Sequence, residues 1–426
     1  MTLVISQLHA QETLDSRGNP TVAVVLYAES GLTVAAGVPA GASTGSREAV
    51  EIRDGDPDRY HGAGVLGAVR NVAGEIADSL VGVPFSSLDE VDQRLLDLDG
   101  SGNKSRLGAN AVAGVSMAAA KAFAVEQKEP LWLSLAGAHV VPRLPVPHFN
   151  VINGGRHAGN GLPFQEFMIA PLGAPSVADA VRAGAEVYAA LRGVLAERGF
   201  STGLGDEGGF APTFSRPEEA LAELVKAIGS AGYKPSRDEV AIAIDPAASE
   251  FYADGRYQIG DQSFTSSDMI EMYSTMLDDF PIWSIEDGLA ESDDAGWRAM
   301  TDQLGDRVQL VGDDNFVTNP AIIADAVVDG IANAALIKVN QVGTVTETLM
   351  ALDVCRRSNY GAMISHRSGE TTDSFIADLA VGAGTGQIKA GAPARGERIA
   401  KYNRLISIEQ ANPALAYGLP ESQRRP

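Results

Sequence analysis

The sequence has a single cysteine, Cys355, no extended basic run and no long uncharged apolar stretch. One cysteine excludes an intrachain disulfide, and a reducing, cytoplasmic setting is the simplest expectation. A membrane-spanning helix needs about 20 predominantly apolar residues. The most apolar stretch, 111–125, contains Lys121 and predicts an alanine-rich helix of a globular fold. We therefore expect no membrane span.

Positive charge is also scarce. Lys and Arg number 33 against 55 Asp and Glu, a formal net charge of −22. Nucleic-acid-binding proteins usually carry a basic patch, so we expect no nucleic-acid partner. The acidic balance still allows an anionic small-molecule substrate if basic side chains gather in one cleft. The N-terminus lacks the basic-then-apolar layout of a signal peptide.

Length and composition predict a folded protein of two domains. The chain has 426 residues, of which 45% are hydrophobic and 21% charged. These values are ordinary for globular proteins and exclude a disordered chain, a collagen or a coiled-coil rod. Domains commonly hold about 100–200 residues. We place a first domain at 1–138 and a second at 139–426.

The first domain has strand patterns before helix patterns. Thr21–Tyr27 is rich in β-branched residues and follows a turn signal at 17–20, and 32–38 resembles its hairpin partner. Helical patterns follow at about 62–80, 87–98 and 108–127. This order predicts an α+β domain. The proline-rich stretch 140–147 predicts a connector, because proline disfavours helix and cannot donate ladder hydrogen bonds.

In the second domain, short apolar runs alternate with helical stretches. The runs are 240–244, 282–285, 308–311, 335–337, 362–364 and 387–388. This alternation predicts parallel βα units and a TIM-type barrel. An open doubly wound sheet is the alternative, although no Gly-x-Gly-x-x-Gly turn follows a first strand.

Each apolar run ends in a polar or charged residue. In order these are Asp245, Glu286, Asp313, Lys338, His366 to Ser368, and Lys389. The carboxyl ends of barrel strands share one face, so these side chains should converge there. Three carboxylates repel one another unless a cation lies between them, and oxygen ligands favour Mg²⁺ or Mn²⁺ over zinc. The cationic residues suit a phosphate and a carboxylate on the substrate. Taken singly, such residues are more often helix caps, turn residues or surface groups, but the joint pattern predicts an active site.

Three glycine-rich loops could contribute to that site. They are Ala40–Gly45, Asn153–Gly159 and Gly205–Gly209, the last of which contains Glu207. Such loops cradle anions through backbone N–H groups or close as lids, although each alone is equally typical of a plain connection.

Several of these segments together resemble one family across nearly the whole chain, the enolase family. The most specific are Leu336–Gly343 and Ser365–Thr371, joined by 15–22, 41–45, 153–155, 165–169, 205–209, 284–287 and 386–389. The resemblance implies an N-terminal α+β cap domain and a modified TIM barrel of the form ββαα(βα)6. It would explain why the regular βα repeat is clear only after about residue 235.

The resemblance also implies a reaction, the Mg²⁺-dependent reversible dehydration of 2-phospho-D-glycerate to phosphoenolpyruvate by a glycolytic hydro-lyase. It implies Asp245, Glu286 and Asp313 as Mg²⁺ ligands, with Ser43 on a second Mg²⁺ that arrives with substrate. Lys338 matches the base, with a pKa lowered by neighbouring cations and metal. Glu207, aided by Glu166, matches the general acid, which needs a raised pKa. The matching substrate contacts are His157, Gln165, His366, Arg367, Ser368 and Lys389.

The chain departs from the usual family pattern at Ala40, Pro246, Gly288 and Ala390. None of these positions is a catalytic side chain, but Pro246 and Gly288 adjoin expected metal ligands. A small displacement there could lower the rate.

Two other functions remain open from the sequence. One is a binding or scaffold protein on the same fold, and the other is a different acid–base enzyme of the superfamily. The resemblance further implies a homodimer, with a larger ring of dimers as the alternative.

Overall fold

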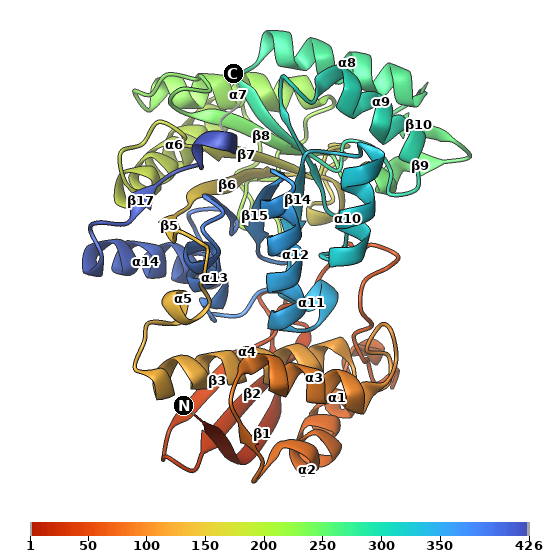
Figure 1. Ribbon diagram of the computed structural model, residues 1–426. Helices are drawn as coiled ribbons and strands as arrows, with labels where there is room; N and C mark the ends of the chain where they lie inside the picture. The colour runs from red at the N-terminus through yellow and green to blue at the C-terminus, as the bar shows by residue number, and fades with distance from the viewer. Residues whose placement is uncertain (1, 424–426) are drawn as a thin grey trace.

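The computed structural model describes residues 2–423, in two parts (Figure 1). The N-terminal part begins with a four-stranded sheet in the order β3-β2-β1-β4. Its strands are β1 (Leu3–Leu14), β2 (Pro20–Ala28), β3 (Thr33–Gly37) and β4 (Pro84–Phe85). β1 and β2 form an antiparallel hairpin that closes where Leu14 faces Pro20. The predicted hairpin of β2 and β3 is confirmed.

Helices follow the first three strands, as the α+β prediction requires. They are η1 (Tyr60–Gly62), α1 (Leu66–Asn71), the π-helical turn η2 (Val72–Ile76), α2 (Ala77–Leu80), α3 (Leu88–Asp99), α4 (Ala109–Gln127) and α5 (Leu131–Ser134). β4 lies between α2 and α3 in the chain. α4 is the alanine-rich helix expected from the sequence, and it packs across β2 and β3. Its small side chains allow this close packing: a Cβ added at Gly114 would lie 2.7 Å from Val24.

The second part is a closed eight-stranded barrel. Its strands are β6 (Val146–Asn153), β7 (Glu166–Ala170), β8 (Ala241–Asp245), β12 (Ile282–Glu286), β13 (Gln309–Gly312), β14 (Ala334–Ile337), β15 (Gly361–Ser365) and β16 (Gln387–Lys389). β7 runs antiparallel to both of its neighbours, β6 and β8, whereas the other ladders are parallel. Closure of the sheet excludes the open doubly wound alternative.

Helices surround the barrel in the order that the ββαα(βα)6 arrangement predicts. They are α6 (Val177–Glu197), α7 (Pro217–Ser230), α8 (Ser266–Asp279), α9 (Asp294–Leu304), α10 (Pro320–Asp329), α11 (Val339–Val342), α12 (Val345–Arg357), α13 (Phe375–Ala383) and α14 (Gly396–Ala411). The fold is therefore an enolase-type modified barrel with an N-terminal α+β cap, as expected.

Alternation along each strand decides which side chains face the barrel interior. In β8, Ile242 and Ile244 belong to the main core, whereas Ala241 and Ala243 belong to a separate interior cluster with Met168. Asp245 continues the interior series, because residues two apart share a face. The last inward-facing residue of such a strand, here Asp245, therefore lies at the carboxyl end of the barrel, which we call the mouth.

One element prediction was wrong. Stretch 140–147 is not all connector, because β5 (Arg143–Leu144) and the start of β6 lie within it. Pro147 pairs with Ile388 of β16 but precedes Phe149, where the ladder to β7 begins. Proline is tolerated near the start of a strand. The boundary between 138 and 139 stays a prediction.

Short elements were missed by sequence analysis. They are the sheet of β9 (Tyr252–Ala253), β10 (Arg256–Ile259) and β11 (Gln262–Phe264), the strand β17 (Ala416–Tyr417), and the turns η3 (Gly155–His157), η4 (Ala248–Phe251) and η5 (Glu421–Gln423). Within residues 2–423, no helix is long and apolar enough to cross a membrane.

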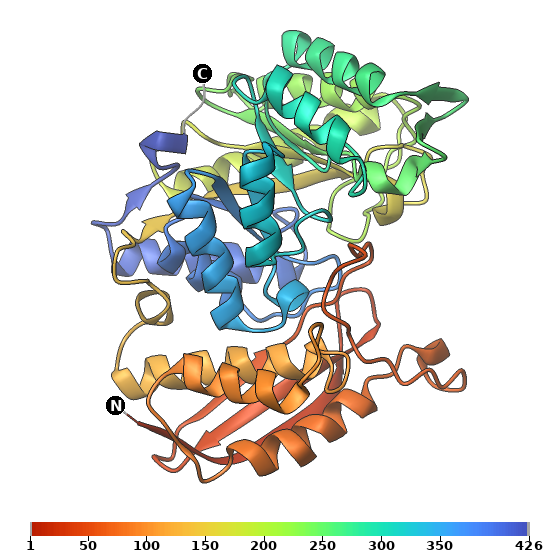
Figure 2. The same cartoon turned by 45° about the vertical axis from the view of Figure 1, so that its right-hand side comes forward.

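The N-terminal part contacts the barrel through buried polar groups. Ser116 Oγ and Asp92 Oδ2 each accept a backbone N–H from the first turn of α12, at 2.9 Å, and so cap that helix across the boundary. Lys104 pairs with Glu347 of α12 at 2.6 Å. A red loop of the N-terminal part also extends up to the barrel (Figure 2).

Candidate active site

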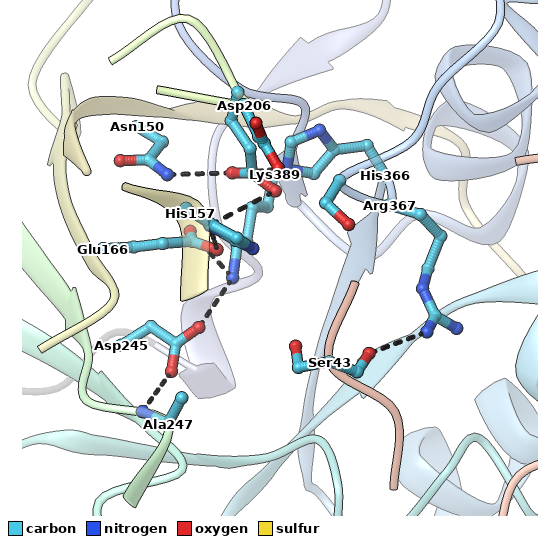
Figure 3. A network of polar contacts seen from close by, with 12 residues as sticks. Ser43, Asn150, His157, Glu166, Asp206, Asp245, Ala247, His366, Arg367 and Lys389 are labelled. Atoms are coloured by element: carbon cyan, nitrogen blue, oxygen red, sulfur yellow. Dashed lines mark hydrogen bonds and ion pairs between the residues drawn. The ribbon is translucent and has the colours of Figure 1, made fainter. Parts of the chain in front are cut away.

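The predicted site residues converge at the barrel mouth. The cavity there is lined by Ser43, His157, Gln165, Glu166, Glu207, Asp245, Asp313, Lys338, His366, Arg367, Ser368 and Lys389, together with Gly41 and Ser365. Glu286 lies beside it, bonded to Lys389. Figure 3 shows part of this network, with Ser43 of the N-terminal part beside Arg367 of the barrel.

One ammonium group lies among three carboxylates. Lys389 Nζ lies 2.7 Å from Glu286 Oε1, 3.0 Å from Glu166 Oε2 and 3.4 Å from Asp245 Oδ2. Burial and then repulsion from Asp245 hold the pKa of Glu286 well above its usual range. Glu286 Oε2 is buried with no hydrogen-bond partner among the described residues. Excess negative charge and a free oxygen fit a divalent cation bound by Asp245, Glu286 and Asp313.

A second carboxylate cluster contains Asp313, one of the expected metal ligands. Oxygens of Asp287, Asp313 and Asp314 lie within 4.8 Å of one another. Asp287 has a left-handed backbone, with φ of 42°, and its oxygens accept the N–H groups of Asp313 at 2.8 Å and Asp314 at 3.1 Å. Asp287 therefore holds the chain after β13 and orients Asp313.

Lys338 forms an ion pair with Asp313. Burial is the largest single influence on Lys338 and lowers its pKa, but the attraction to Asp313 and, less strongly, to Glu286 opposes it, and the pKa is raised overall. The lowered pKa expected from the sequence is therefore not found, and Lys338 is cationic in this arrangement.

Glu166 and Glu207, which line the same cavity, have pKa values shifted in opposite directions. Burial and repulsion from Glu207 hold the pKa of Glu166 well above its usual range. Burial also raises the pKa of Glu207, but His366 and His157 outweigh it and hold that pKa well below its usual range. The raised pKa expected for Glu207 is thus wrong for this state, and the two directions favour a proton on Glu166 over one on Glu207. Asn150 Nδ2 donates to Glu207 Oε2 at 2.8 Å.

His157 lies between these two carboxyls. Its Nδ1 is 3.6 Å from Glu166 Oε1 and 3.8 Å from Glu207 Oε1. Burial lowers the pKa of His157, which favours a neutral ring. A neutral imidazole can both accept and donate a proton, so His157 has the chemistry to transfer a proton between Glu166 and Glu207.

Arg367 is held from both parts of the molecule. Its Nη1 donates to Glu48 Oε2 at 2.9 Å and to Asn340 Oδ1 at 3.3 Å. Its Nη2 donates to Glu48 Oε1 at 3.1 Å and to the Ser43 carbonyl at 3.2 Å. The guanidinium thus forms a bidentate ion pair with Glu48. Arginine binds phosphate groups with the same bidentate geometry.

Two family models match the chain. The enolase C-terminal TIM barrel domain matches residues 141–418, and the enolase N-terminal domain matches residues 5–135. The chain belongs to the enolase family. Membership supports an enzyme of the lyase class in a metal-dependent family that acts on a phosphorylated small molecule.

The departures from the usual enolase pattern leave these polar groups in place. Ala40 forms a backbone bridge with Gly369. A Cβ at Gly288 would lie 3.1 Å from Ile285, so a larger residue would need its neighbours to move. Pro246 precedes Ala247, whose N–H donates to Asp245 Oδ1 at 2.8 Å. Ala390 is fully buried.

Sequence reasoning missed Asn150, Glu48 and Arg398, each of which bonds to a residue of this site. Asn150 had a usable signal, because it continues the alternating interior series of Val146 and His148 in β6. Glu48 and Arg398 had none, since each meets its partner only through the tertiary fold.

Proposed function

We propose that this chain catalyses the reversible, Mg²⁺-dependent dehydration of 2-phospho-D-glycerate to phosphoenolpyruvate. The observation that carries the proposal is the shared cavity. Lys338 and the carboxylates for a divalent cation lie in or beside the cavity that Arg367 and Ser368 line. A phosphorylated hydroxy acid carries a phosphate, which Arg367 and Ser368 would bind, and a carboxylate, which would lie at the cation.

The carboxylate ligands would be Asp245, Glu286 and Asp313, with Ser43 near a second ion that arrives with substrate. Bound Mg²⁺ neutralises the negative charge that develops on the substrate carboxylate when the adjacent proton leaves. Lys389 lies among the same carboxylates and adds a donor for that substrate carboxylate. Arg367 and Ser368 would bind the phosphate.

Lys338 is the proposed base for the C2 proton. Its ion pair with Asp313 fixes the position of Nζ, but a base must first lose its proton, so the attraction to Asp313 has to weaken when substrate binds. Glu207 would carry the proton to the departing C3 hydroxyl, with Glu166 as the neighbouring proton store. His157, Gln165 and His366 line the space between.

The resting protonation favours the hydration direction. An ionised Glu207 can accept a proton from water that adds to phosphoenolpyruvate, whereas dehydration requires Glu207 to gain a proton first. Glu166 is the proposed proton source, since His157 Nδ1 lies 3.6 Å from Glu166 Oε1 and 3.8 Å from Glu207 Oε1.

The test is the ultraviolet absorbance of phosphoenolpyruvate formed from 2-phosphoglycerate. We expect a signal that requires Mg²⁺, disappears with excess chelator and falls by a factor of roughly 10²–10⁴ or more in Lys338→Ala. Absence of signal from folded, Mg²⁺-loaded protein would remove this proposal and favour a binding role. A panel of hydroxy acids without phosphate separates it from other acid–base reactions of the superfamily.

Cellular setting and assembly complete the proposal. We propose a glycolytic enzyme of the cytoplasm that forms a homodimer through the N-terminal domain, with a ring of dimers as the alternative. Sedimentation velocity distinguishes these assemblies.

A further inference from the structure

Arg398 is a fully buried arginine on α14 that the proposed reaction does not use. Its Nη1 donates to His366 Nδ1 and, at 2.7 Å, to the Arg367 carbonyl. Its Nη2 reaches Ser16 Oγ, the Asp206 carbonyl and the Ser368 carbonyl. One side chain therefore ties Ser16 of the N-terminal part to the segment 366–368 and to the loop that carries Glu207.

Space for this side chain comes from Gly391. A Cβ there would lie 2.7 Å from Arg398 Cδ, and the residue has a left-handed backbone with φ of 85°. Glu397 Oε1 lies 3.3 Å from Arg398 Nε, so the guanidinium charge is balanced within the protein.

The contact with His366 decides which ring nitrogen carries hydrogen. Arginine stays protonated in proteins and only donates, so His366 Nδ1 must accept through its lone pair. Burial, with a smaller contribution from Arg398, lowers the pKa of His366 to about 4, although Glu207 opposes them. A neutral ring whose Nδ1 accepts carries its hydrogen on Nε2.

His366 Nε2 lies 3.3 Å from Glu207 Oε2. We propose that Arg398 is a positioning residue that fixes the Nε2–H tautomer of His366, so that the polar hydrogen, rather than a lone pair, lies on the ring nitrogen 3.3 Å from Glu207 Oε2. The other tautomer would place a lone pair against the carboxylate. The tautomer of His366 can be measured whether or not the proposed reaction occurs. Its effect on catalysis rests on the proposed function.

Other charged groups surround this pair. Arg398 and Glu370 act on His366 besides Glu207. Glu207 is also faced by His157, Glu166, Lys389 and the Asn150 amide. Arg398 is the group of this set that donates to His366 Nδ1.

The test uses imidazole ¹⁵N spectra of the full chain labelled with [¹⁵N]histidine, with His366→Gln to assign the signal. In the wild type we expect an unprotonated Nδ1 and a protonated Nε2 from about pH 6 to 9, where Arg398 remains charged. In Arg398→Met we expect a shift toward the Nδ1–H tautomer. Arg404→Met is the matched control, since Arg404 lies on the same helix but pairs with Asp378, and its spectrum should match the wild type.

A wild-type Nδ1–H tautomer overturns the proposal, even if Arg398→Met does not fold. So does a folded Arg398→Met with an unchanged tautomer. In the activity assay, the limb of the kcat–pH profile that reports Glu207 should move to higher pH in Arg398→Met. If the tautomer changes but wild-type protein forms no phosphoenolpyruvate, the positioning role stands and the proposed function fails.

Discussion

Lys389 Nζ lies 2.7 Å from Glu286 Oε1, so a cation supplied by the chain itself occupies the carboxylate cluster. A divalent ion bound by the same oxygens would compete with this ammonium for them. Removal of the Lys389 ammonium should therefore raise the metal affinity, whereas removal of a carboxylate ligand should lower it.

We expect Lys389→Met to bind Mg²⁺ more tightly than the wild type, because it removes a competing charge at similar side-chain length. We expect Asp245→Asn to bind it at least roughly tenfold more weakly, because it removes a ligand. Isothermal titration calorimetry measures both. Asp261→Asn, at an exposed position, is the control and should match the wild type; equal affinity in all variants would place the ion elsewhere.

Glu48 should compete with phosphate for Arg367. The four terminal N–H groups of Arg367 already face protein acceptors, two of which are the oxygens of Glu48. Glu48→Gln should therefore bind inorganic phosphate roughly three- to tenfold more tightly, because a charged competitor becomes neutral. Calorimetry with Glu29→Gln as an exposed control checks this. Weaker binding would mean that Glu48 mainly orients the guanidinium.

Gly41 leaves room for the same guanidinium. A Cβ added at Gly41 would lie 1.9 Å from Arg367 Nη2 and 2.7 Å from its Cζ, so Arg367 would have to move. We expect Gly41→Ala to lower kcat/KM by about 10²-fold with little change in melting temperature, since misplacement of a binding group by about 1 Å costs that much. Gly102→Ala, where no heavy atom lies within 4 Å of the added Cβ, should behave as wild type.

Asp92 should make stability depend on pH. Burial raises its pKa from 3.8 to about 6, against hydrogen bonds from Thr346 and Ser116 that lower it. The folded protein then holds a proton that the unfolded chain has lost, so this residue's contribution to stability falls between about pH 4 and 6 and stays lower above that range. The shift corresponds to about 3 kcal/mol at neutral pH.

Asp92→Asn should therefore be more stable than the wild type at pH near 7, by up to about that amount, and nearly equal to it near pH 4. Melting temperatures at both pH values measure the difference. Asp78→Asn, at an exposed position on α2, should show no such pH-dependent gain. A loss of stability at neutral pH would mean that Asp92 is needed as an anion to cap α12.

Much of the fold followed from local patterns. Apolar runs such as 282–285 predicted barrel strands, and the charged residue after each run marked the mouth, because side-chain alternation is a property of a single strand. The antiparallel direction of β7 was implied only by resemblance, since one strand's sequence does not encode its orientation. The pKa values of Lys338 and Glu207 depend on Asp313 and His366, which come from distant segments, and neither direction could be read from the chain.

The reversed direction of β7 has a consequence for Glu207. In a regular βα unit, a loop that follows a helix lies at the amino-terminal end of the barrel. Because β7 descends from the mouth, α6 rises toward it and α7 descends again, so the loop between these two helices faces the mouth. One inverted strand thus changes the polarity of the next helical connection. It gives the catalytic face a loop that an all-parallel barrel would place at the opposite end, and Glu207 lies on that loop.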